Sequence, residues 1–426
     1  MPFRFVHTAD LHLDSPLRSL ALKNAELAEL VRGATRSALS AIVDLCIAEA
    51  VDALLIAGDL YDGSQTSMNT ALFLSAELRR LEQAGIRVFV IRGNHDSQST
   101  IKRELSLPAN VHLFSGRVKP MLAKTLDNGR EVYVHGVGFD NPHMAESLLP
   151  SFAAPVEDAI NIGMLHTSLA GAPGHDNYAP ASVADLVAHG FDYWALGHVH
   201  LRQVHHEKPL VVMPGMPQGR DINEAGDKSV TLVSIDDEGR LSHEERLIGH
   251  AAFLRLSVDL TGAEDWQEML ARVKTAMGEA RRRLRADQVI LRLNLGGVTP
   301  LAWNLRRDPE FLEAEIANVA GGYPGLWVEA VELSCRSGDI DMTTSADPVH
   351  ELSALVHDTV LPSHGYRHEA QAVVEELLAQ LPRELREQMA GDEGALARLV
   401  AEISQAGSDD VLAHLQAGGA DGGDAR

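Results

Sequence analysis

Short groups of metal-binding residues follow the strand-like segments in the first half of this 426-residue chain. The groups are Asp10-Leu11-His12, Gly58-Asp59-Leu60-Tyr61-Asp62, Gly93-Asn94-His95-Asp96, His166 and Gly197-His198-Val199-His200. In open α/β sheets, ligands bind outside the carboxyl ends of the strands. The loops that carry these residues are therefore expected to meet at one edge of a sheet.

Residues 3–250 repeat a rhythm of strand, loop and helix, which predicts an α/β domain. The expected strands are Phe3–His7, Ala53–Ala57, Arg87–Ile91, Glu131–Val137, Asn161–Leu165 and Tyr193–Leu196. The expected helices are Ala34–Ala50 and Ser67–Ala84. A closing strand pair at Ser229–Ile235 and Leu241–Gly249 follows a turn-rich loop, so the domain is expected to end near residue 250.

The rest of the chain predicts two further regions and a tail. Residues 251–340 alternate strand, helix, strand, helix, strand, which predicts a small α/β cap domain. Residues 341–416 are helical in pattern, with Val373, Leu377, Leu378 and Leu381 expected on one face. This helical region is a candidate for partner docking. Residues 417–426, rich in Gly and Asp, are expected to be disordered.

Composition constrains the setting. The sequence has no basic leader and no apolar run of about 18 residues, so we expect neither export nor a membrane partner. Its two cysteines, Cys46 and Cys335, fit buried reduced thiols and a cytoplasmic location. A net charge of −23 argues against DNA binding by counterion release, but a local basic strip can offset it. The candidate DNA-binding strip is Arg281, Arg282, Arg283 and Arg285.

That strip has a simpler interpretation, in which positive side chains complement the dipole at the end of a solvated helix. The metal-binding groups have a similar alternative, because a single histidine is more often a core or surface residue than a ligand. Because all the groups occur together, in this order and each after a strand-like segment, the sequence favours a metal site. His166 is supported by the shortest surrounding motif of the set, Gly163-Met164-Leu165-His166-Thr167. For His7, support of the site and simple packing remain equally open.

The residue types indicate a pair of divalent ions. The expected ligands are two carboxylates, one amide oxygen and four imidazoles: Asp10, His12, Asp59, Asn94, His166, His198 and His200. Two ions about 3.5 to 4 Å apart lower the pKa of a bridging water and clamp phosphoryl oxygens, which suits phosphoester hydrolysis.

Asp59 is the candidate bridge between the two ions. His200 is expected to join Asp10 and His12 at one ion, and His166 and His198 to join Asn94 at the other. Alternation in an extended His198-Val199-His200 segment would direct both imidazoles to one side and Val199 into packing.

The motif set resembles the calcineurin-like metallophosphoesterases. Within them, Val6-His7-Thr8-Ala9-Asp10-Leu11-His12-Leu13-Asp14-Ser15-Pro16 resembles the SbcD-type DNA repair exonucleases, and the YhaO-like subgroup most. The loop Pro214-Gly215-Met216-Pro217-Gln218-Gly219-Arg220 with Glu224 supports the same subgroup. The resemblance is specific over residues 1–250, looser to about 340 and faint beyond.

The resemblance implies a fold, a metal and further roles. It implies a four-layer β-sandwich flanked by helices, manganese as the usual metal and a nuclease that cuts DNA from its ends. It also implies that His95 is a catalytic acid and not a ligand, and an imidazole pKa suits that work. Asp62 and Asp96 are expected to be catalytic-site carboxylates that orient His95 or the ligand imidazoles.

Three functions compete. The leading one is a manganese-dependent DNA exonuclease or endonuclease in DNA repair. The second is a phosphodiesterase or phosphatase that acts on nucleotides or other small phosphoesters. The third is a scaffold that has lost its chemistry, which the intact ligand set and His95 oppose. The expected partners are DNA, an SMC-like or AAA-type ATPase, and a second copy of the chain in a homodimer.

Overall fold

A computed structural model describes residues 2–15, 25–62, 67–96, 107–114, 119–138, 144–169, 178–337, 348–381 and 383–420. The chain divides into two compact units. Unit 1 comprises Met1–Arg255, Arg281–Leu291 and Gly325–Glu329, and unit 2 comprises Leu256–Ala280, Arg292–Pro324 and Ala330–Arg426. Among the described residues, no helix is both long enough and apolar enough to cross a membrane.

The first sheet of unit 1 carries the first three ligand groups. Its strand order is β12-β11-β1-β2-β3-β4. The strands are β1 (Phe3–Thr8), β2 (Ala53–Ala57), β3 (Arg87–Ile91), β4 (Val111–Leu113), β11 (Ser229–Ile235) and β12 (Leu241–Leu247). Strands β1 to β4 are parallel, whereas β11 is antiparallel to both β1 and β12. The ends of β1, β2 and β3 therefore lie along one edge.

The second sheet carries the remaining ligand groups and has the order β5-β6-β7-β8-β10-β9. Its strands are β5 (Met121–Thr125), β6 (Glu131–Gly136), β7 (Ile160–His166), β8 (Tyr193–Gly197), β9 (Gln203–Glu207) and β10 (Leu210–Met213). Strands β6, β7, β8 and β10 are parallel, and the outer strands β5 and β9 are antiparallel to their neighbours. A short 3₁₀ helix, Leu149–Ser151, precedes β7.

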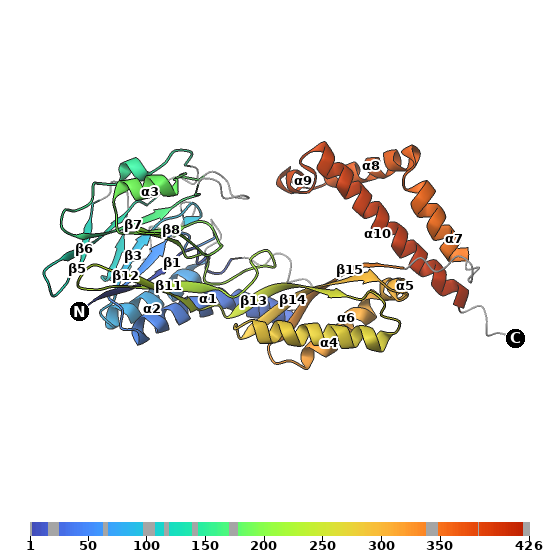
Figure 1. The fold of residues 1–426 in the computed structure, drawn as a ribbon, viewed down its shortest axis with the longest axis horizontal. Helices are drawn as coiled ribbons and strands as arrows, with labels where there is room; N and C mark the ends of the chain where they lie inside the picture. Colours follow the sequence, from blue (N-terminus) through green and yellow to red (C-terminus); the bar gives the residue numbers. More distant parts are fainter. Residues whose placement is uncertain are drawn as a thin grey trace. The chain divides into compact units, whose positions relative to one another are not determined.

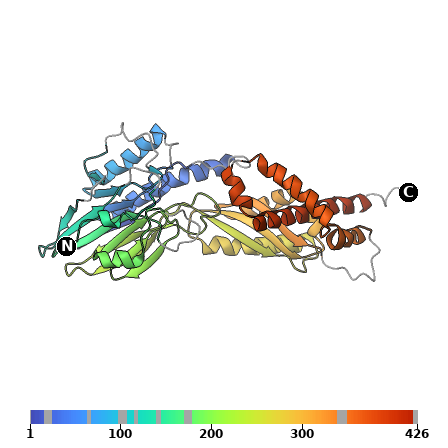
Figure 2. The ribbon, with the colours of Figure 1, turned by 90° about the horizontal axis from the view of Figure 1, so that it is seen from above.

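The two sheets pack face to face around an apolar core that includes Phe5, Phe89 and Ile162. Helices α1 (Ala25–Ala48) and α2 (Met68–Gln83) cover the outer face of the first sheet, and α3 (Val183–His189) covers that of the second. In Figures 1 and 2, α2 in light blue and α3 in green lie on opposite sides of the strands. The predicted α/β class with four layers is thus confirmed.

The segment from Ala251 to Arg336 has the strand and helix order expected for a small α/β domain. Strands β13 (Ala251–Asp259), β14 (Gln288–Val298) and β15 (Leu326–Arg336) form a three-stranded sheet in that order. The helices are α4 (Trp266–Arg283), α5 (Ala302–Arg307) and α6 (Pro309–Gly321). The sequence pattern does not predict helix α5.

The last part of unit 2 is helical. Its elements are α7 (Pro348–Leu355), a π-helical turn (Val356–Val360), α8 (His364–Ala379), α9 (Arg383–Ala390) and α10 (Glu393–Ala420). Helix α10 continues past the expected end near Gln416, and residues 421–426 of the predicted disordered tail lie outside the described residues.

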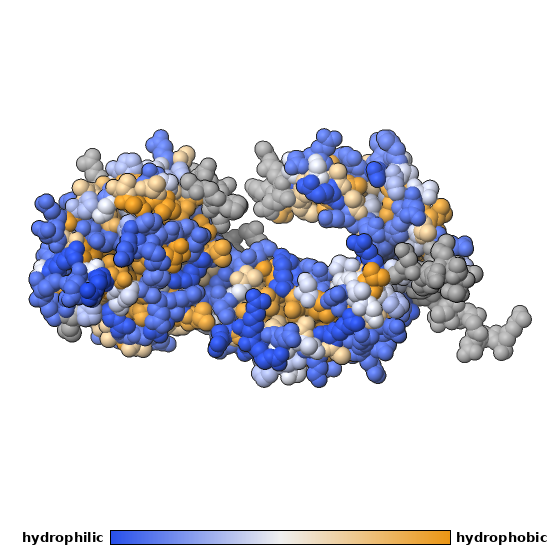
Figure 3. Space-filling view, viewed as in Figure 1, coloured by the Kyte–Doolittle hydropathy of each residue, from blue (hydrophilic) through white to orange (hydrophobic). Residues whose placement is uncertain are grey.

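The predicted apolar face of α8 is only partly correct. Leu378 packs with Val374 and Val400, and Leu381 lies against this cluster, but Val373 and Leu377 are 57% and 56% exposed. Positions 374, 378 and 381 repeat at helical spacing, which places 373 and 377 on a neighbouring face. In Figure 3, hydrophobic residues show at the surface of the helical region among hydrophilic ones.

Candidate metal centre

The loops after the strands of unit 1 turn sharply through left-handed backbone conformations. Asp10, His12 and Asp59 have φ angles of 53°, 41° and 53°, and His198 has a φ of 101°. Such angles are uncommon outside glycine, although Asp and His adopt them more readily than most residues. The Asp10 amide donates to the Gly58 carbonyl at 3.0 Å, and the His12 amide to the Asp59 carbonyl at 3.0 Å. These bonds fix the loops after β1 and β2 against each other.

Glycines allow the close approach of the loops. A Cβ atom on Gly93 would lie 2.1 Å from Asp59 Oδ1, and one on Gly58 would lie 2.4 Å from His166 Nδ1. Gly58 also has a φ of 96°, which favours glycine directly. The glycine before Asp59 is therefore required both by its backbone angle and by the space available, and the glycine before Asn94 by the space available.

Asp10, His12 and His200 form one group of metal-binding atoms, all within 4.8 Å of one another. The Nε2 atoms of His12 and His200 lie 3.3 Å apart. His200 Nδ1 lies 2.8 Å from Glu224 Oε1, and since a carboxylate only accepts, Nδ1 carries the proton. The Nε2 of His200 then presents a lone pair toward His12.

Asn94, His166 and His198 form the other side of the centre with Asp59. His166 Nδ1 donates to the Ala57 carbonyl at 2.9 Å, which leaves Nε2 facing Asn94 Oδ1 at 3.0 Å and Asp59 Oδ2 at 3.4 Å. His198 Nδ1 lies 3.3 Å from Asn94 Oδ1. Asp59, between the two groups, also lies 3.7 Å from His12 Nε2 through the same Oδ2.

This arrangement fits cations. With His166 neutral, its Nε2, the amide oxygen of Asn94 and the carboxylate oxygen of Asp59 are all acceptors that face one another at short range. Burial lowers the pKa of His166, yet the Asp59 carboxylate outweighs it and raises that pKa to about 9. The carboxyl pKa of Asp59 is held well below its usual range by His166 and His12 in spite of burial. The buried carboxylates thus favour positive charge here, and divalent ions would supply it.

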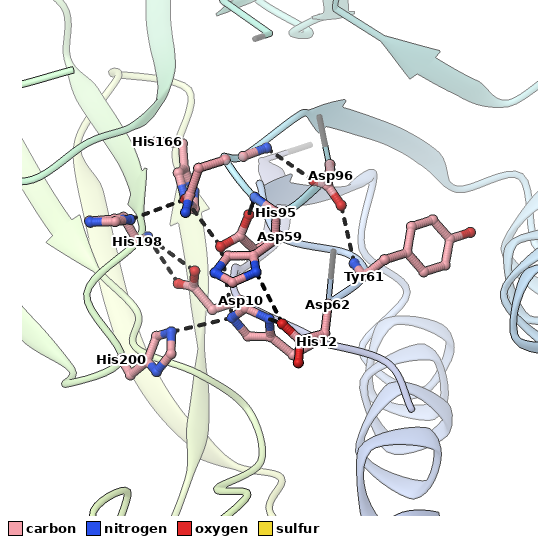
Figure 4. A network of polar contacts seen from close by, with 12 residues as sticks. Asp10, His12, Asp59, Tyr61, Asp62, His95, Asp96, His166, His198 and His200 are labelled. Carbon is pink, nitrogen blue, oxygen red and sulfur yellow. Dashed lines mark hydrogen bonds and ion pairs between the residues drawn. The ribbon is translucent and has the colours of Figure 1, made fainter. Parts of the chain in front are cut away.

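All seven predicted ligands converge on this centre, as Figure 4 shows for the labelled carboxylates and imidazoles. The prediction for the segment His198-Val199-His200 is wrong in one respect. His198 has a φ of 101°, so the segment bends and is not extended. The bend directs His198 to Asn94 and His200 to His12, while Val199 packs into the apolar cluster under α3 as expected.

His95 lies beside the centre and is paired with Asp62. Its Nδ1 lies 3.0 Å from Asp62 Oδ1, and its side chain is 41% exposed. The bond to Asp62 raises the pKa of His95 above its ordinary value. His12, Asp62 and His95 also form a group whose donor atoms lie within 4.8 Å of one another. A partly exposed imidazole held by a carboxylate is the geometry expected of a general acid.

Asp96 occupies a different place from the one expected. Its oxygens accept from the backbone amides of Tyr61 at 3.1 Å and Gly93 at 3.0 Å. These bonds join the loops after β2 and β3. Burial and the nearby Asp59 raise the pKa of Asp96 to about 7. Asp96 therefore supports the loop backbone, whereas Asp62 is the carboxylate that holds His95.

Further residues around the centre have no role predicted from the sequence. Glu224 and Arg220 contact each other and the ligand His200, and Tyr178 stacks on His198 with ring centroids 5.5 Å apart. The sequence marks Glu224 and Arg220 only as members of a YhaO-like loop, and nothing in it singles out Tyr178.

Of the two roles expected for His7, the structure favours packing. Its ring nitrogens lie 2.9 Å from the Tyr193 hydroxyl and 3.0 Å from the Leu196 carbonyl, both on β8.

The arginine cluster lies at the end of α4, as expected. Arg281 donates to the carbonyls of Leu284 and Ala286 at 3.4 and 3.3 Å, which satisfies groups just beyond the helix. Arg282, Arg283 and Arg285 are exposed. All four residues belong to unit 1. DNA binding by this cluster stays a prediction.

Comparison with known proteins identifies the family. The calcineurin-like phosphoesterase family matches residues 3–202, and the family described as metallophosphoesterase YhaO, middle domain, matches residues 253–336. The chain is 35% identical over 315 residues to the uncharacterized metallophosphoesterase YhaO of Bacillus subtilis, which covers 73% of this chain and 76% of that protein. The chain belongs to the YhaO family of calcineurin-like metallophosphoesterases. The predicted family is confirmed, and the phosphoester hydrolase class follows from it.

More distant relatives are named for DNA repair. A DNA double-strand break repair protein Mre11 of Methanopyrus kandleri is 25% identical over 312 residues, 67% of this chain and 63% of that protein. The Mre11 of Sulfurisphaera tokodaii is 26% identical over 205 residues, 47% of this chain and 50% of that protein. A solved dimetal phosphatase from Danio rerio matches with 11% identity and a TM-score of 0.37, over 58% of this chain and 99% of that one.

Proposed function

We propose that this metallophosphoesterase is a manganese-dependent DNA nuclease that hydrolyses phosphodiester bonds. The observation that carries the proposal is the convergence of lone-pair atoms from Asp10, Asp59, Asn94 and the ligand histidines. They lie beside His95, which is partly exposed and held by a carboxylate. Distant similarity to proteins named Mre11 supports DNA as the substrate. The chain spans 63% and 50% of those two proteins, so substrate and partners remain part of the proposal.

Each group of residues has a distinct task in this proposal. Asp10, His12 and His200 would hold one divalent ion, Asn94, His166 and His198 the other, and Asp59 would contact both. When bound, two ions provide a nucleophile at neutral pH and neutralise charge on the phosphoryl oxygens. His95 would donate a proton to the leaving sugar oxygen, and Asp62 would keep its ring in place by accepting from Nδ1.

Manganese is the proposed metal because it is the usual metal of the enzymes that the motif set resembles. The mixed set of carboxylate and amide oxygens with imidazole nitrogens is compatible with it. The DNA would contact the exposed arginines at the end of α4. We also propose that the helical region from residue 341 docks an SMC-like or AAA-type ATPase.

A hydrolase that acts on small phosphoesters is the alternative, and one observation favours it. The net charge of −23 repels a long polyanion unless local positive charge offsets it. Both functions use the same centre, so only the substrate separates them.

The deciding experiment offers the purified chain three substrates with Mn²⁺ or Mg²⁺ in turn. These are end-labelled duplex DNA, end-labelled single-stranded DNA and a small chromogenic phosphodiester. Cleavage of DNA with Mn²⁺ is expected. Turnover of the small ester with no DNA cleavage would contradict the nuclease proposal and favour the alternative.

A further inference from the structure

The loop between β10 and β11 reaches the ligand His200 and the Asp62–His95 pair through two residues. Glu224 accepts from the ring of His200 at 2.8 Å, and it also accepts from Arg220, whose amide and Nη2 lie 2.7 and 2.6 Å from its oxygens. Arg220 Nη1 lies 3.4 Å from Ser15 Oγ and 3.9 Å from Asp62 Oδ2. Ser15 donates to Asp62 at 2.6 Å, and Asp62 holds His95.

We propose that Glu224 and Arg220 are positioning residues that orient the ligand His200 and couple it to the Asp62–His95 pair. The inference rests on the proposed metal centre and deepens it. Neither residue belongs to the two groups assigned to the ions. Both act through the side chains they hold.

Glu224 sets which nitrogen of His200 is available. A carboxylate can only accept, so its contact at 2.8 Å places the proton on Nδ1 and the lone pair on Nε2. That Nε2 faces His12 and lies in the group with Asp10. Without Glu224, the ring could rotate or take the other tautomer, and either change would remove a ligand atom from this group.

Arg220 keeps Glu224 in place. The Glu224 side chain is only 11% exposed, and a buried carboxylate needs partners that satisfy its oxygens. His200 donates to Oε1 at 2.8 Å, and Arg220 donates to both carboxylate oxygens through its amide, Nε and Nη2. The planar guanidinium meets the carboxylate while its other nitrogen faces Ser15 and Asp62, a geometry that lysine cannot reproduce.

The coupling follows from these contacts. One arginine lies between a carboxylate that orients a ligand and a carboxylate that orients His95. A change at Arg220 should therefore disturb both His200 and the Asp62–His95 pair, whereas a change at Glu224 should mainly disturb His200.

Calorimetric titration of the metal-free chain with Mn²⁺ tests the proposal. Glu224→Ala is expected to weaken one of two binding steps by about 10- to 100-fold and leave the other unchanged. Glu224→Gln should lose less, because its amide oxygen can still accept from His200. The matched control is Glu207→Ala, since Glu207 pairs with His243 at 3.6 Å and is 73% exposed. The control should bind Mn²⁺ as the wild type does.

A double variant tests whether Arg220 acts through Glu224. Arg220→Ala should weaken the same binding step, and Arg220→Ala with Glu224→Ala should be no weaker than Glu224→Ala alone. Additive losses, or wild-type affinity in Glu224→Ala, would overturn the proposal. If Glu224→Ala does not fold by circular dichroism, Arg220→Lys replaces it, and wild-type Mn²⁺ affinity there has the same consequence.

The titration contains no substrate, so its outcome is independent of the nuclease proposal. A chain that binds Mn²⁺ as predicted but leaves DNA intact contradicts the substrate and leaves the positioning roles supported. If the wild type cleaves DNA and Glu224→Ala binds Mn²⁺ as tightly as the wild type, only the positioning roles are contradicted.

Discussion

The metal centre of unit 1 and the helical region of unit 2 are stabilised in different ways. In the centre, buried polar groups such as Asp10, His12 and Asp59 are fixed by backbone angles and hydrogen bonds between loops. In the helical region, a small apolar cluster around Leu378 joins α8 to α10, and many large apolar side chains stay exposed. The centre should be sensitive to single polar atoms, and the helices to buried volume.

Replacement of Asp59 by Asn should give the largest effect and abolish cleavage. Asp59 faces both ligand groups, so the loss of its charge removes a shared ligand and leaves imidazoles without a counter-charge. We expect loss of bound metal and a fall in phosphodiester turnover of at least about 10³-fold. Metal content after dialysis and turnover of a chromogenic phosphodiester measure both. Retention of two ions at wild-type affinity would contradict the shared role.

His95→Asn should separate chemistry from metal binding within the same centre. His95 contacts Asp62 and contributes no atom to the two groups assigned to the ions. Turnover should fall by about 10²- to 10⁴-fold, the usual contribution of a general acid. Metal content should match that of the wild type. Full activity in this variant would refute the assignment of the acid.

Leu378→Ala tests the apolar side of the comparison. Leu378 is 9% exposed within the α8–α10 cluster, and its truncation should destabilise that region by about 2 to 5 kcal/mol. Hydrogen exchange of the α8 and α10 amides measures the loss. The neighbouring Leu377→Ala is the control, because Leu377 is 56% exposed and should change stability by less than about 0.5 kcal/mol. Equal effects in the two variants, or a loss of metal binding, would contradict the contrast between regions.

His7 should make unit 1 less stable at acid pH. Burial lowers the pKa of His7 to about 3, so the folded chain keeps it neutral while the unfolded chain binds a proton below about pH 6.5. Stability from this residue is full above about pH 6.5 and should fall by about 1.4 kcal/mol per pH unit as the pH drops toward about 3. Denaturant unfolding in chelator at about pH 7 and about pH 5.5, for wild type and His7→Gln, isolates this contribution. A wild-type curve parallel to that of the variant would rule it out.

The smallest effect is expected at the surface of α4. Reversal of Arg281, Arg282 and Arg283 to Glu should weaken DNA affinity and flatten its salt dependence, by about 0.9 in logarithmic slope for each phosphate that is no longer neutralised. Arg240→Glu is the control, since Arg240 is 74% exposed in the turn between β11 and β12. An unchanged slope would indicate that these arginines only complement the dipole at the end of the helix.

Much of unit 1 could be predicted because each motif follows a strand. The bounds expected for β2, β3 and β11 match those observed, and the strand ends bring Asp10, Asp59 and Asn94 together. Position after a strand does not fix a side chain's partner, however. Asp96 adjoins His95 in sequence yet bonds to backbone amides, and Glu224 reaches His200 across 24 positions through a loop with no periodic pattern.

The helical region is less predictable because periodicity alone does not select a face. Val373, Leu377, Leu378 and Leu381 are all apolar, and which of them are buried depends on how α10 packs. The bend at His198 has a similar origin. The left-handed residue His198 donates its amide to the Asp10 carboxylate at 3.0 Å, a contact between distant positions that no local pattern records.

The left-handed residues also limit how this chain can be stabilised by engineering. Substitution by glycine relieves a left-handed position, commonly by about 1 kcal/mol. Ala50 and Asp158, with φ angles of 47° and 58°, have no part in the centre and are open to that improvement. Asp10, His12, Asp59 and His198 are not, because glycine would delete the side chains that define the site. The stability that a designer can recover here therefore lies outside the active loops.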